Sequence, residues 1–486
     1  MNLSLLSNPE WVRHRRALLR PATATAIVAV TLMLCALTAS IMNEHVMVGM
    51  VLLAHLVGLP IWVGFTCSKS ITHERALETF DFWRTTRLTP YELILGQLCG
   101  VPLMGFLTAA CTMPIAIMAV TLGINPVDFV LGYVMLLLLC ATIGLGGLVS
   151  SMWATPFRSG RGLLWFIVGY FLLWMLSVGS GSFWKHGLST MTPYHYLGEI
   201  GMHLGEIDVN ILAARTDLFF GRLTVPSVLL GVGLNVSLSW WFLVMLQRNI
   251  KKNLDDIRFL SRWQAVGFAM FLNLLFYALW KPSPEQWRIG AISTVAQGLY
   301  VLNLTTLYVI GMMVLTPHER LRVWWREWSA GRASYLAEDG LPWPWVVMTV
   351  VCMAAPAYLA MEFSHGNAKD FAWQLGILAV FVIRDITFLQ WCLCQNFKRP
   401  LFTGLLYLSL YYFIAQFFLG QSLLVGNLFV PSFLIDSEPS HPLVTILVQG
   451  LITWLILWQL LQQLKTPARI LAPTRVPVDE RPLPTA

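Results

Sequence analysis

The sequence predicts an all-α polytopic membrane protein, and three observations lead to this fold class. The chain has 486 residues, of which 57% are apolar and only 12% are charged, whereas soluble domains are about 25% charged. Its apolar runs are about 20 residues long, the length that a helix needs to cross a bilayer. Helices are expected because lipid offers the backbone no hydrogen-bond partner, and the alternating pattern of a membrane β-barrel is missing.

Twelve runs are long and apolar enough to be membrane spans. They lie near 21–42, 45–66, 93–122, 127–153, 162–179, 223–246, 263–280, 290–315, 343–361, 371–394, 401–428 and 442–464. The first run is longer than the apolar part of a secretory signal, which reaches about 15 residues. We therefore expect it to stay in the protein as an anchor helix.

The distribution of positive charge predicts the orientation of these spans. With twelve spans, the two tails and alternate connections hold 25 of the 32 Lys and Arg residues. Cytoplasmic segments carry this excess, so both termini are expected in the cytoplasm, with the lipid bilayer around the spans. The net charge of +7 is spread over many segments without a dense basic patch, which indicates no nucleic-acid partner.

The cysteines and histidines do not predict a metal site. The eight cysteines lie in or beside predicted spans and indicate no disulfide framework outside the membrane. In the 180–222 connection, His195, Glu199, His203 and Glu206 would share one face of a helix. Such a face could bind zinc, but the polar side of an interfacial helix is the favoured interpretation.

Short matches at a constant spacing indicate an internal duplication. The tripeptide HER occurs at 73–75 and 318–320, and four further features recur 242 residues apart, among them Pro114 with Pro356 and Tyr170 with Tyr412. We infer two six-span halves related as parallel repeats. The expected organisation is a cytoplasmic segment 1–20, a first half 21–250, a basic linker 251–262, a second half 263–465 and a Pro-rich cytoplasmic tail 466–486.

The segment after the second span is too charged to cross a bilayer and too aromatic for an ordinary loop. As a helix from Glu74 to Thr85, it would place Leu77, Phe80 and Trp83 on one face. Acidic side chains would occupy the opposite face. This pattern predicts an interfacial helix over 73–88.

A sharp corner should follow this helix. Thr89 is a good N-cap, Pro90 suits the first helical position, and Glu92 lies three residues after the cap to complete a capping box. The second half has an altered version over 318–328. There Thr316 and Glu319 are expected to cap a helix.

The stretch ERALETFDFWRTTRLTPYELILGQL resembles the corresponding stretch of type-2, export-class ATP-binding-cassette (ABC) permeases. The matching positions are Glu74, Arg75, Thr79, Phe80, Asp81, Thr85, Thr89, Pro90, Glu92, Leu93 and Gly96. Glu78 replaces the usual Gly, and Gln97 replaces the usual Lys. The clear match covers about 25 residues, and the six-span plan extends it loosely over the first half.

The resemblance implies that the 73–88 segment is a coupling helix, which docks on an ATPase subunit. The residues expected to couple are Glu74, Arg75, Glu78, Thr79, Asp81, Trp83 and Arg84. Glu319, Arg320 and Trp328 would form a second, degenerate coupling element. The chain would then be the permease of an exporter in a bacterial inner membrane.

The chain has no GxxxxGK[ST] motif, so it lacks the phosphate-binding loop of an ATPase. No cofactor or catalytic residue is expected in it, and ATP and Mg would bind a separate ATPase subunit. One chain over two ATPase copies is the favoured arrangement, and a homodimer of this chain is the competing one.

Two other functions remain open at this point, an ion-coupled secondary transporter and a membrane-embedded transferase. Arg384 and Asp385 are the only adjacent charges inside a predicted span. They could be a transport site or a structural pair between helices.

Overall fold

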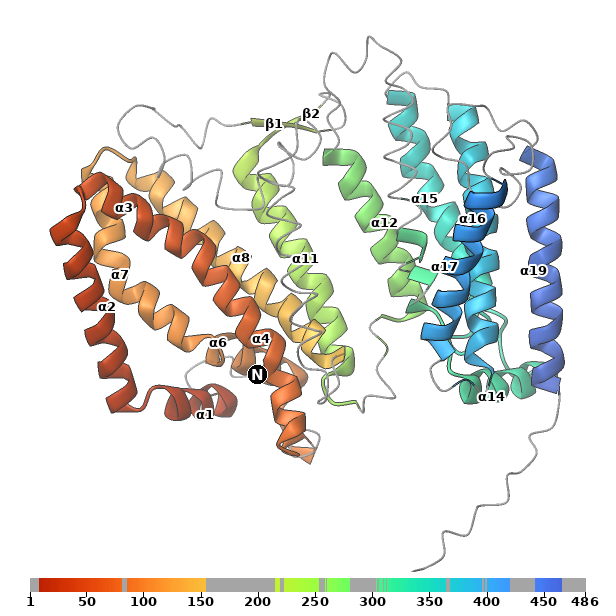
Figure 1. Ribbon diagram of the computed structural model, residues 1–486, viewed down its shortest axis with the longest axis horizontal. Helices are drawn as coiled ribbons and strands as arrows, with labels where there is room; N and C mark the ends of the chain where they lie inside the picture. Colours follow the sequence, from red (N-terminus) through yellow and green to blue (C-terminus); the bar gives the residue numbers. More distant parts are fainter. Residues whose placement is uncertain are drawn as a thin grey trace, which may run out of the picture. The chain divides into compact units, whose positions relative to one another are not determined.

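The computed structural model describes residues 8–80, 85–153, 215–218, 223–252, 260–279, 313–363, 368–395, 400–419 and 442–465, with a few single positions between them. Helices make up nearly all of these ranges (Figure 1). The chain divides into two compact units, Met1–Val295 with Leu359–Gly366 and Ala296–Tyr358 with Asn367–Ala486.

The first unit is a helical bundle with one β-hairpin. Its elements are α1 (Pro9–Leu18), α2 (Pro21–Ile41), α3 (Glu44–Leu53), the π-helical turn η2 (Ala54–Gly58), α4 (Leu59–Ala76), α6 (Pro90–Gly100), α7 (Leu103–Thr121), α8 (Pro126–Trp153), β1 (Arg215–Leu218), β2 (Leu223–Pro226), α11 (Ser227–Asn249) and α12 (Arg262–Leu279). The strands pair antiparallel, with Thr216 opposite Val225. The short α1 lies across the ends of the long helices (Figure 1).

The second unit contains five described helices: α14 (His318–Ser329), α15 (Trp343–Phe363), α16 (Ala368–Leu393), α17 (Pro400–Leu419) and α19 (Pro442–Lys465). α16 packs along α19. The apolar face of the amphipathic α14 is buried, where Leu321 and Trp324 pack in one cluster with Leu460 and Leu464 of α19.

Seven helices in the described part of the chain are long and apolar enough to cross a membrane. They are Pro21–Ile41, Glu44–Ala76, Leu103–Thr121, Pro126–Met152, Val228–Asn249, Leu375–Leu393 and Leu443–Lys465. Each coincides with a predicted span. The predicted span 162–179 lies outside the described residues, as does most of 290–315. The chain is therefore a helical, multi-pass membrane protein.

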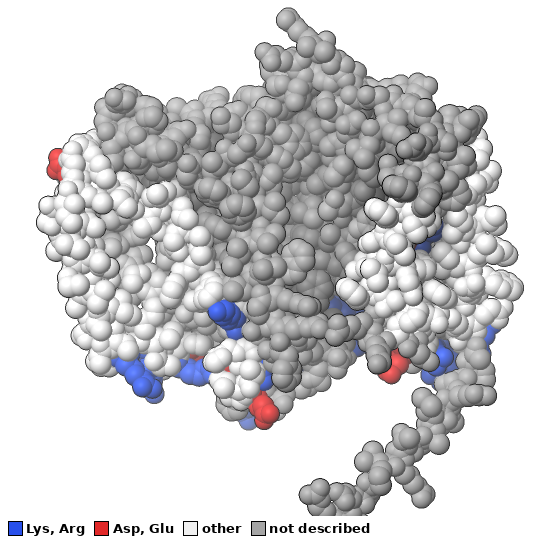
Figure 2. All heavy atoms as spheres, viewed as in Figure 1, with Lys and Arg blue, Asp and Glu red and all other residues white. Residues whose placement is uncertain are grey.

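The surface of the first unit agrees with this assignment. Its Lys and Arg atoms gather at the end where α1 lies, and the visible flanks of its helices carry no charge (Figure 2). Large apolar side chains are exposed on these flanks, such as Met33 at 65% and Leu37 at 55% on α2. Apolar flanks between charged ends suit a protein surrounded by lipid.

Two long helices, α4 and α8, form the centre of the first unit. A Cβ on Gly147 of α8 would lie 2.9 Å from the carbonyl oxygen of Gly64 on α4, so only glycine permits this approach. Near the ends of the two helices, the Ser151 hydroxyl accepts a 3.1 Å hydrogen bond from the Thr72 amide. The end of α4 is thus fixed against α8, and this end leads into the segment that resembles a coupling helix.

Candidate functional site

The expected continuous helix from Glu74 to Thr85 does not form. α4 ends at Ala76, and Leu77 to Thr79 make a turn in which Glu78 has a φ of +58°. The Glu78 amide donates to the Arg75 carbonyl and the Thr79 amide to the Glu74 carbonyl, both at 3.1 Å. This is a Schellman-type helix end, where a left-handed residue, usually glycine, follows the cap. Glu78 therefore occupies a backbone position that favours glycine.

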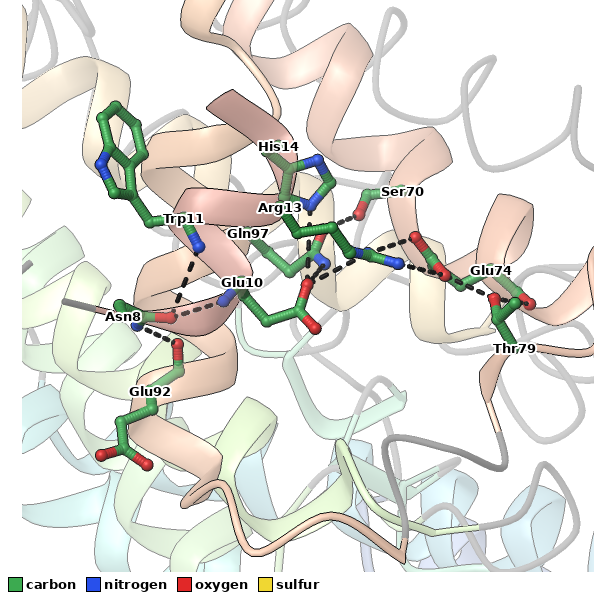
Figure 3. A network of polar contacts seen from close by, with 10 residues as sticks. All are labelled: Asn8, Glu10, Trp11, Arg13, His14, Ser70, Glu74, Thr79, Glu92 and Gln97. Atoms are coloured by element: carbon green, nitrogen blue, oxygen red, sulfur yellow. Dashed lines mark hydrogen bonds and ion pairs between the residues drawn. The ribbon is translucent and has the colours of Figure 1, made fainter. Parts of the chain in front are cut away.

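Glu74 points into the protein, although the sequence led us to expect it on a docking surface. It is 7% exposed. Its carboxylate accepts hydrogen bonds from the Arg13 guanidinium at 2.6 and 3.3 Å and from the Thr79 hydroxyl at 2.5 Å. The carboxylate therefore joins α1, the end of α4 and the turn (Figure 3).

Arg75 is also engaged inside the unit. Its Nη1 donates to the Met152 carbonyl of α8 at 2.7 Å, and its guanidinium lies 4.6 Å from the centre of the Phe80 ring. The Phe80 side chain is itself buried, with 7% of its surface exposed. Arg75 thus holds the turn against α8.

The exposed part of this segment is the turn that follows α4. His73 and residues 76–79 are exposed, and Leu77 shows 57% of its surface. Asp81, Trp83 and Arg84, which the resemblance also assigns to coupling, lie outside the described residues. Among the described residues, the exposed turn is Leu77, Glu78 and Thr79, and we call it the docking turn because the resemblance assigns Glu78 and Thr79 to ATPase docking.

The capping box expected at the corner is present at the start of α6. Glu92 accepts a 2.7 Å hydrogen bond from the Thr89 amide, and the Glu92 amide donates to the Thr89 hydroxyl at 3.3 Å, with Pro90 in the first turn. The hydrogen bonds that the Thr89 amide and hydroxyl donate to the Glu92 carboxylate lower the pKa of this carboxyl. Lys251, just after α11, donates to the Leu88 carbonyl at 2.5 Å. The corner is thus fixed from both sides.

The N-terminal helix α1 links the corner to the rest of the unit. Asn8 caps α1 by accepting from the Glu10 amide at 2.9 Å, and its Nδ2 donates to the Glu92 carbonyl at 2.7 Å. Farther along, the Gln97 amide group donates to Glu10 at 3.4 Å and accepts a short hydrogen bond from Ser70 of α4 (Figure 3). α1, α4 and α6 therefore form one hydrogen-bonded assembly.

Two glycines on α6 permit α1 to lie so close. A Cβ on Gly96 would lie 2.4 Å from the Glu10 Cβ, and one on Gly100 would lie 2.8 Å from the His14 Cβ. Both approaches are too short for any larger residue. Gly96 also matches a glycine of the resembled permeases, and Gln97 replaces their lysine with a neutral, fully buried side chain.

Burial also changes the ionisation of α1. It lowers the pKa of His14 to about 4, so this imidazole is neutral at pH 7. Burial raises the pKa of Glu10, and the nearby Arg13 opposes that rise. Arg13 Nη2 lies 3.0 Å from Glu10 and 2.6 Å from Glu74, so one cation serves two carboxylates. The cation and the two carboxylates hold α1 against α4.

Sequence reasoning did not identify α1, because the 1–20 segment was taken as a basic cytoplasmic tail. Two signals in the sequence, one in this segment and one on α6, could have predicted the helix and its contact. Asn8 and Pro9 are the residues preferred at an N-cap and at the first helical position. Gly96 and Gly100 lie four residues apart, which is the spacing of small residues at close helix contacts.

The counterpart in the second half lacks the expected cap. α14 begins at His318 after Pro317, which makes no side-chain cap. Thr316 and Gln390 of α16 bond each other instead, through the Thr316 amide at 2.9 Å and its carbonyl at 2.8 Å. The prediction of a Thr316–Glu319 cap was wrong, because Pro317 occupies the N-cap position and the Thr316 backbone bonds to Gln390 of α16.

The residues assigned to the second coupling element differ in exposure. Glu319 is exposed and Arg320 is half-buried. Trp328 is 38% exposed and stacks on Trp324 with 5.8 Å between ring centres. Its ring therefore belongs to an aromatic cluster that braces α14 on its own unit.

Arg384 and Asp385 are buried at the centre of the second unit. Arg384 lies 2.6 Å from Asp385, and donates to Gln449 of α19 at 2.6 Å and to Tyr411 and Tyr412 of α17 at 3.0 and 2.8 Å. Asp385 also accepts from Tyr412 at 2.5 Å and from Tyr308 through a short hydrogen bond. We call these residues the α16 polar network.

Of the five N–H groups of a guanidinium, four in Arg384 have hydrogen-bond acceptors, one through Nε, two through Nη1 and one through Nη2. Nη2 also lies 2.6 Å from Asp385 Oδ1. Asp385 accepts hydrogen bonds from three donors, Arg384 Nε, Tyr308 and Tyr412. Through its bonds to Gln449 of α19 and to Tyr411 and Tyr412 of α17, the pair holds helices together. Of the two interpretations that the sequence allowed, the geometry favours the structural pair.

The His195–Glu206 group lies outside the described residues. Among the residues that are described, no group of three or more His, Cys, Asp and Glu side chains could hold a metal ion.

Comparison with known proteins does not add a relationship. No protein-family model matches the chain, and no curated protein or solved structure matches it significantly.

Proposed function

We propose that this chain is the permease of an ABC-type exporter, driven by a separate ATPase subunit that binds ATP and Mg. The observation that carries the proposal is the corner between the second and third spans. A turned helix end, an exposed docking turn and a capped helix start follow one another there, and α1 joins the two helices. This is a construction suited to receiving a push at the membrane surface and passing it to two spans.

The assembly of α1, α4 and α6 explains how a push would be transmitted. Arg13 ties α1 to Glu74 at the end of α4, and Asn8 ties α1 to Glu92 at the start of α6. Force on the docking turn would move α4 and α6 together, because α1 cannot follow one helix without the other. Glu74 and Arg75 then hold the corner, and the contact with the ATPase falls to the docking turn and the residues after it.

Equivalent polar contacts in the two units support twelve spans in two parallel repeats. Thr142 of α8 bonds Asn235 of α11 at 3.1 Å and Ser239 at 2.9 Å. Arg384 of α16 bonds Gln449 of α19 at 2.6 Å. Positions 142 and 384 are 242 residues apart, the spacing of the sequence matches, and in each unit they join the expected fourth span to the expected sixth.

With twelve spans both termini lie in the cytoplasm. One chain then forms the whole pathway over two ATPase copies in a bacterial inner membrane. In the competing arrangement, two chains form a homodimer through their first halves.

The α16 polar network disfavours an ion-coupled secondary transporter. Such a transporter needs a carboxylate that exchanges its ion or proton during each cycle. Asp385 is the candidate, and its two oxygens accept hydrogen bonds from Tyr308, Tyr412 and Arg384 Nε.

The proposal is tested by purifying the tagged chain in mild detergent and identifying what accompanies it. We expect an ABC ATPase subunit with the wild type, and its loss when Glu78→Lys reverses the charge of the docking turn. Glu44→Lys is the matched control, since Glu44 is exposed at the opposite end of the second span. Glu327→Lys on α14 tests whether the second unit also couples.

Two results would contradict the proposal. One is that no ATPase is recovered with wild-type protein under any mild condition. The other is that Glu44→Lys and Glu78→Lys reduce the recovery equally, because the docking turn would then have no special role.

A further inference from the structure

The second span contains an irregular turn that the corner does not explain. The helical run from Glu44 to Ala76 changes from α to π geometry at Ala54–Gly58 and returns to α geometry at Leu59. A π turn holds one residue more than an α turn and is often found at functional sites. Pro60 follows directly, and a proline ring displaces the carbonyl four residues earlier, here that of Leu56. Backbone hydrogen bonding in the second span is therefore least regular around residues 54–60.

His55 lies in the π turn and joins three helices. It is 5% exposed. Its Nδ1 lies 2.7 Å from the Tyr133 hydroxyl of α8, and its Nε2 lies 2.5 Å from the Thr112 hydroxyl of α7. The Tyr133 ring meets the imidazole edge-on, with 5.9 Å between centres.

The neighbours of His55 determine which of its nitrogens carries the proton. The Thr112 hydroxyl donates to the carbonyls of Thr108 and Ala109, each at 3.1 Å. Its oxygen is then free to accept from Nε2–H, and Nδ1 accepts from the Tyr133 hydroxyl. A neutral imidazole satisfies both contacts, and an apolar side chain would satisfy neither.

The contact with α7 also lies near a weak point. Pro114 is inside α7, two residues after Thr112, and it removes one backbone hydrogen bond from that helix. The space beside the π turn is open, because a Cβ on Gly58 would meet no atom within 4 Å. The π turn and the proline of a neighbouring span thus lie close to each other, with His55 between their helices.

The parts of the second span on either side of the π turn differ in their main neighbours. Before it, α3 packs mainly against α7, and after it, α4 packs mainly along α8 and only to a smaller extent against α7. The α4 part ends in the docking turn. A bend at the π turn would therefore move the docking turn and α8 relative to α3 and α7.

We propose that the π turn at Ala54–Gly58 is the hinge of the coupling movement and that His55 is the positioning residue that sets its resting angle. All residues of the hinge lie in this chain, so its existence does not depend on an ATPase partner. Only the source of the force rests on the proposed function, so the two ideas can fail separately.

The movement is large enough to measure. From the π turn to Leu77 is about 20 residues, or about 30 Å of helix, so a bend of about 20° would displace Leu77 by about 10 Å. Spin labels carried by unnatural amino acids at Leu77 and at Met33 of α2, both exposed, leave the eight native cysteines in place. Electron–electron resonance then gives the distribution of distances between them in lipid nanodiscs.

Deletion of Val57 is the decisive variant, because removing one residue converts a π turn into an α turn. We expect wild type to populate a second distance and the deletion variant to lose it. Pro60→Ala removes the proline ring without shortening the chain, and it should reduce the population at the second distance. This variant replaces the deletion variant if the latter does not fold. The hinge is overturned if the distribution of label distances in wild type is as narrow as in the folded Val57 deletion variant. The same holds if it is as narrow as in Pro60→Ala.

His55 is tested by two substitutions that differ in hydrogen bonding. His55→Gln can still donate and accept, and we expect a distribution like that of wild type. His55→Leu should shift the population toward the second distance. Equal behaviour of the two variants would overturn the positioning role. If the hinge is present but neither the ATPase nor ATP shifts it, the hinge stands and the proposed function fails.

Discussion

The contact between α1 and α6 depends on Gly96, and adding one methyl group there should separate the two helices. A Cβ at this position would lie 2.4 Å from the Glu10 Cβ, which neither backbone can tolerate without moving. Overpacking of this kind costs about 1–3 kcal/mol, and the better helix propensity of Ala offsets about 1 kcal/mol of it. A net loss of about 1.4 kcal/mol would lower the fraction of docked α1 about tenfold relative to undocked α1.

Limited trypsin digestion followed by mass spectrometry measures this effect, because α1 carries exposed arginines at 13, 15 and 16. We expect Gly96→Ala to be cut within α1 faster than wild type. Gly233→Ala on α11 is the matched control, since a Cβ there meets nothing within 4 Å. It should be cut at the wild-type rate.

If Gly96→Ala and Gly233→Ala are both cut like wild type, α1 does not rest on α6 through Gly96. The assembly of α1, α4 and α6 would then lose its basis. Increased cutting in both variants would point to a general loss of stability and would contradict the reasoning equally.

Three further predictions test other parts of the structure by thermal unfolding in detergent. Glu78→Gly should raise the melting temperature, because φ at +58° costs a non-glycine residue about 1–2 kcal/mol, whereas Glu78→Ala should not. His14 has a folded pKa of about 4 against an ordinary 6.5, so stability is complete above 6.5 and falls as the pH drops. About 1 kcal/mol should be lost between pH 7 and about pH 5.5, and His14→Gln should abolish this loss. Asp385→Asn should destabilise by about 3–5 kcal/mol, because it leaves Arg384 buried without its counter-charge, and Thr142→Val should cost far less.

The sequence predicted the spans and the capped corner well, because both depend on local residues. Long apolar runs define spans wherever they fold. Thr89, Pro90 and Glu92 form a capping box that needs no distant partner. The positions of seven described spans follow directly from this local information.

Two of the differences concern contacts between segments far apart in the chain. Glu74 was expected on a docking surface, and its partner Arg13 lies 61 residues earlier. Thr316 was expected to cap α14, and Gln390 bonds it from 74 residues away. The left-handed turn at Glu78 was missed because a glutamate does not mark such a position, as a glycine would. Local pattern cannot show these partners, so side-chain roles were harder to predict than helices.

The central claim is that the docking turn contacts a separate ATPase, and site-specific photocrosslinking tests it most directly. A photoreactive amino acid replaces Leu77, which is 57% exposed, or Leu37 on a lipid-facing flank, which is 55% exposed. The account predicts that, in cells, Leu77 crosslinks to an ATP-hydrolysing subunit and Leu37 does not. Crosslinks from Leu77 that are the same as those from Leu37, with no ATPase among them, would contradict it.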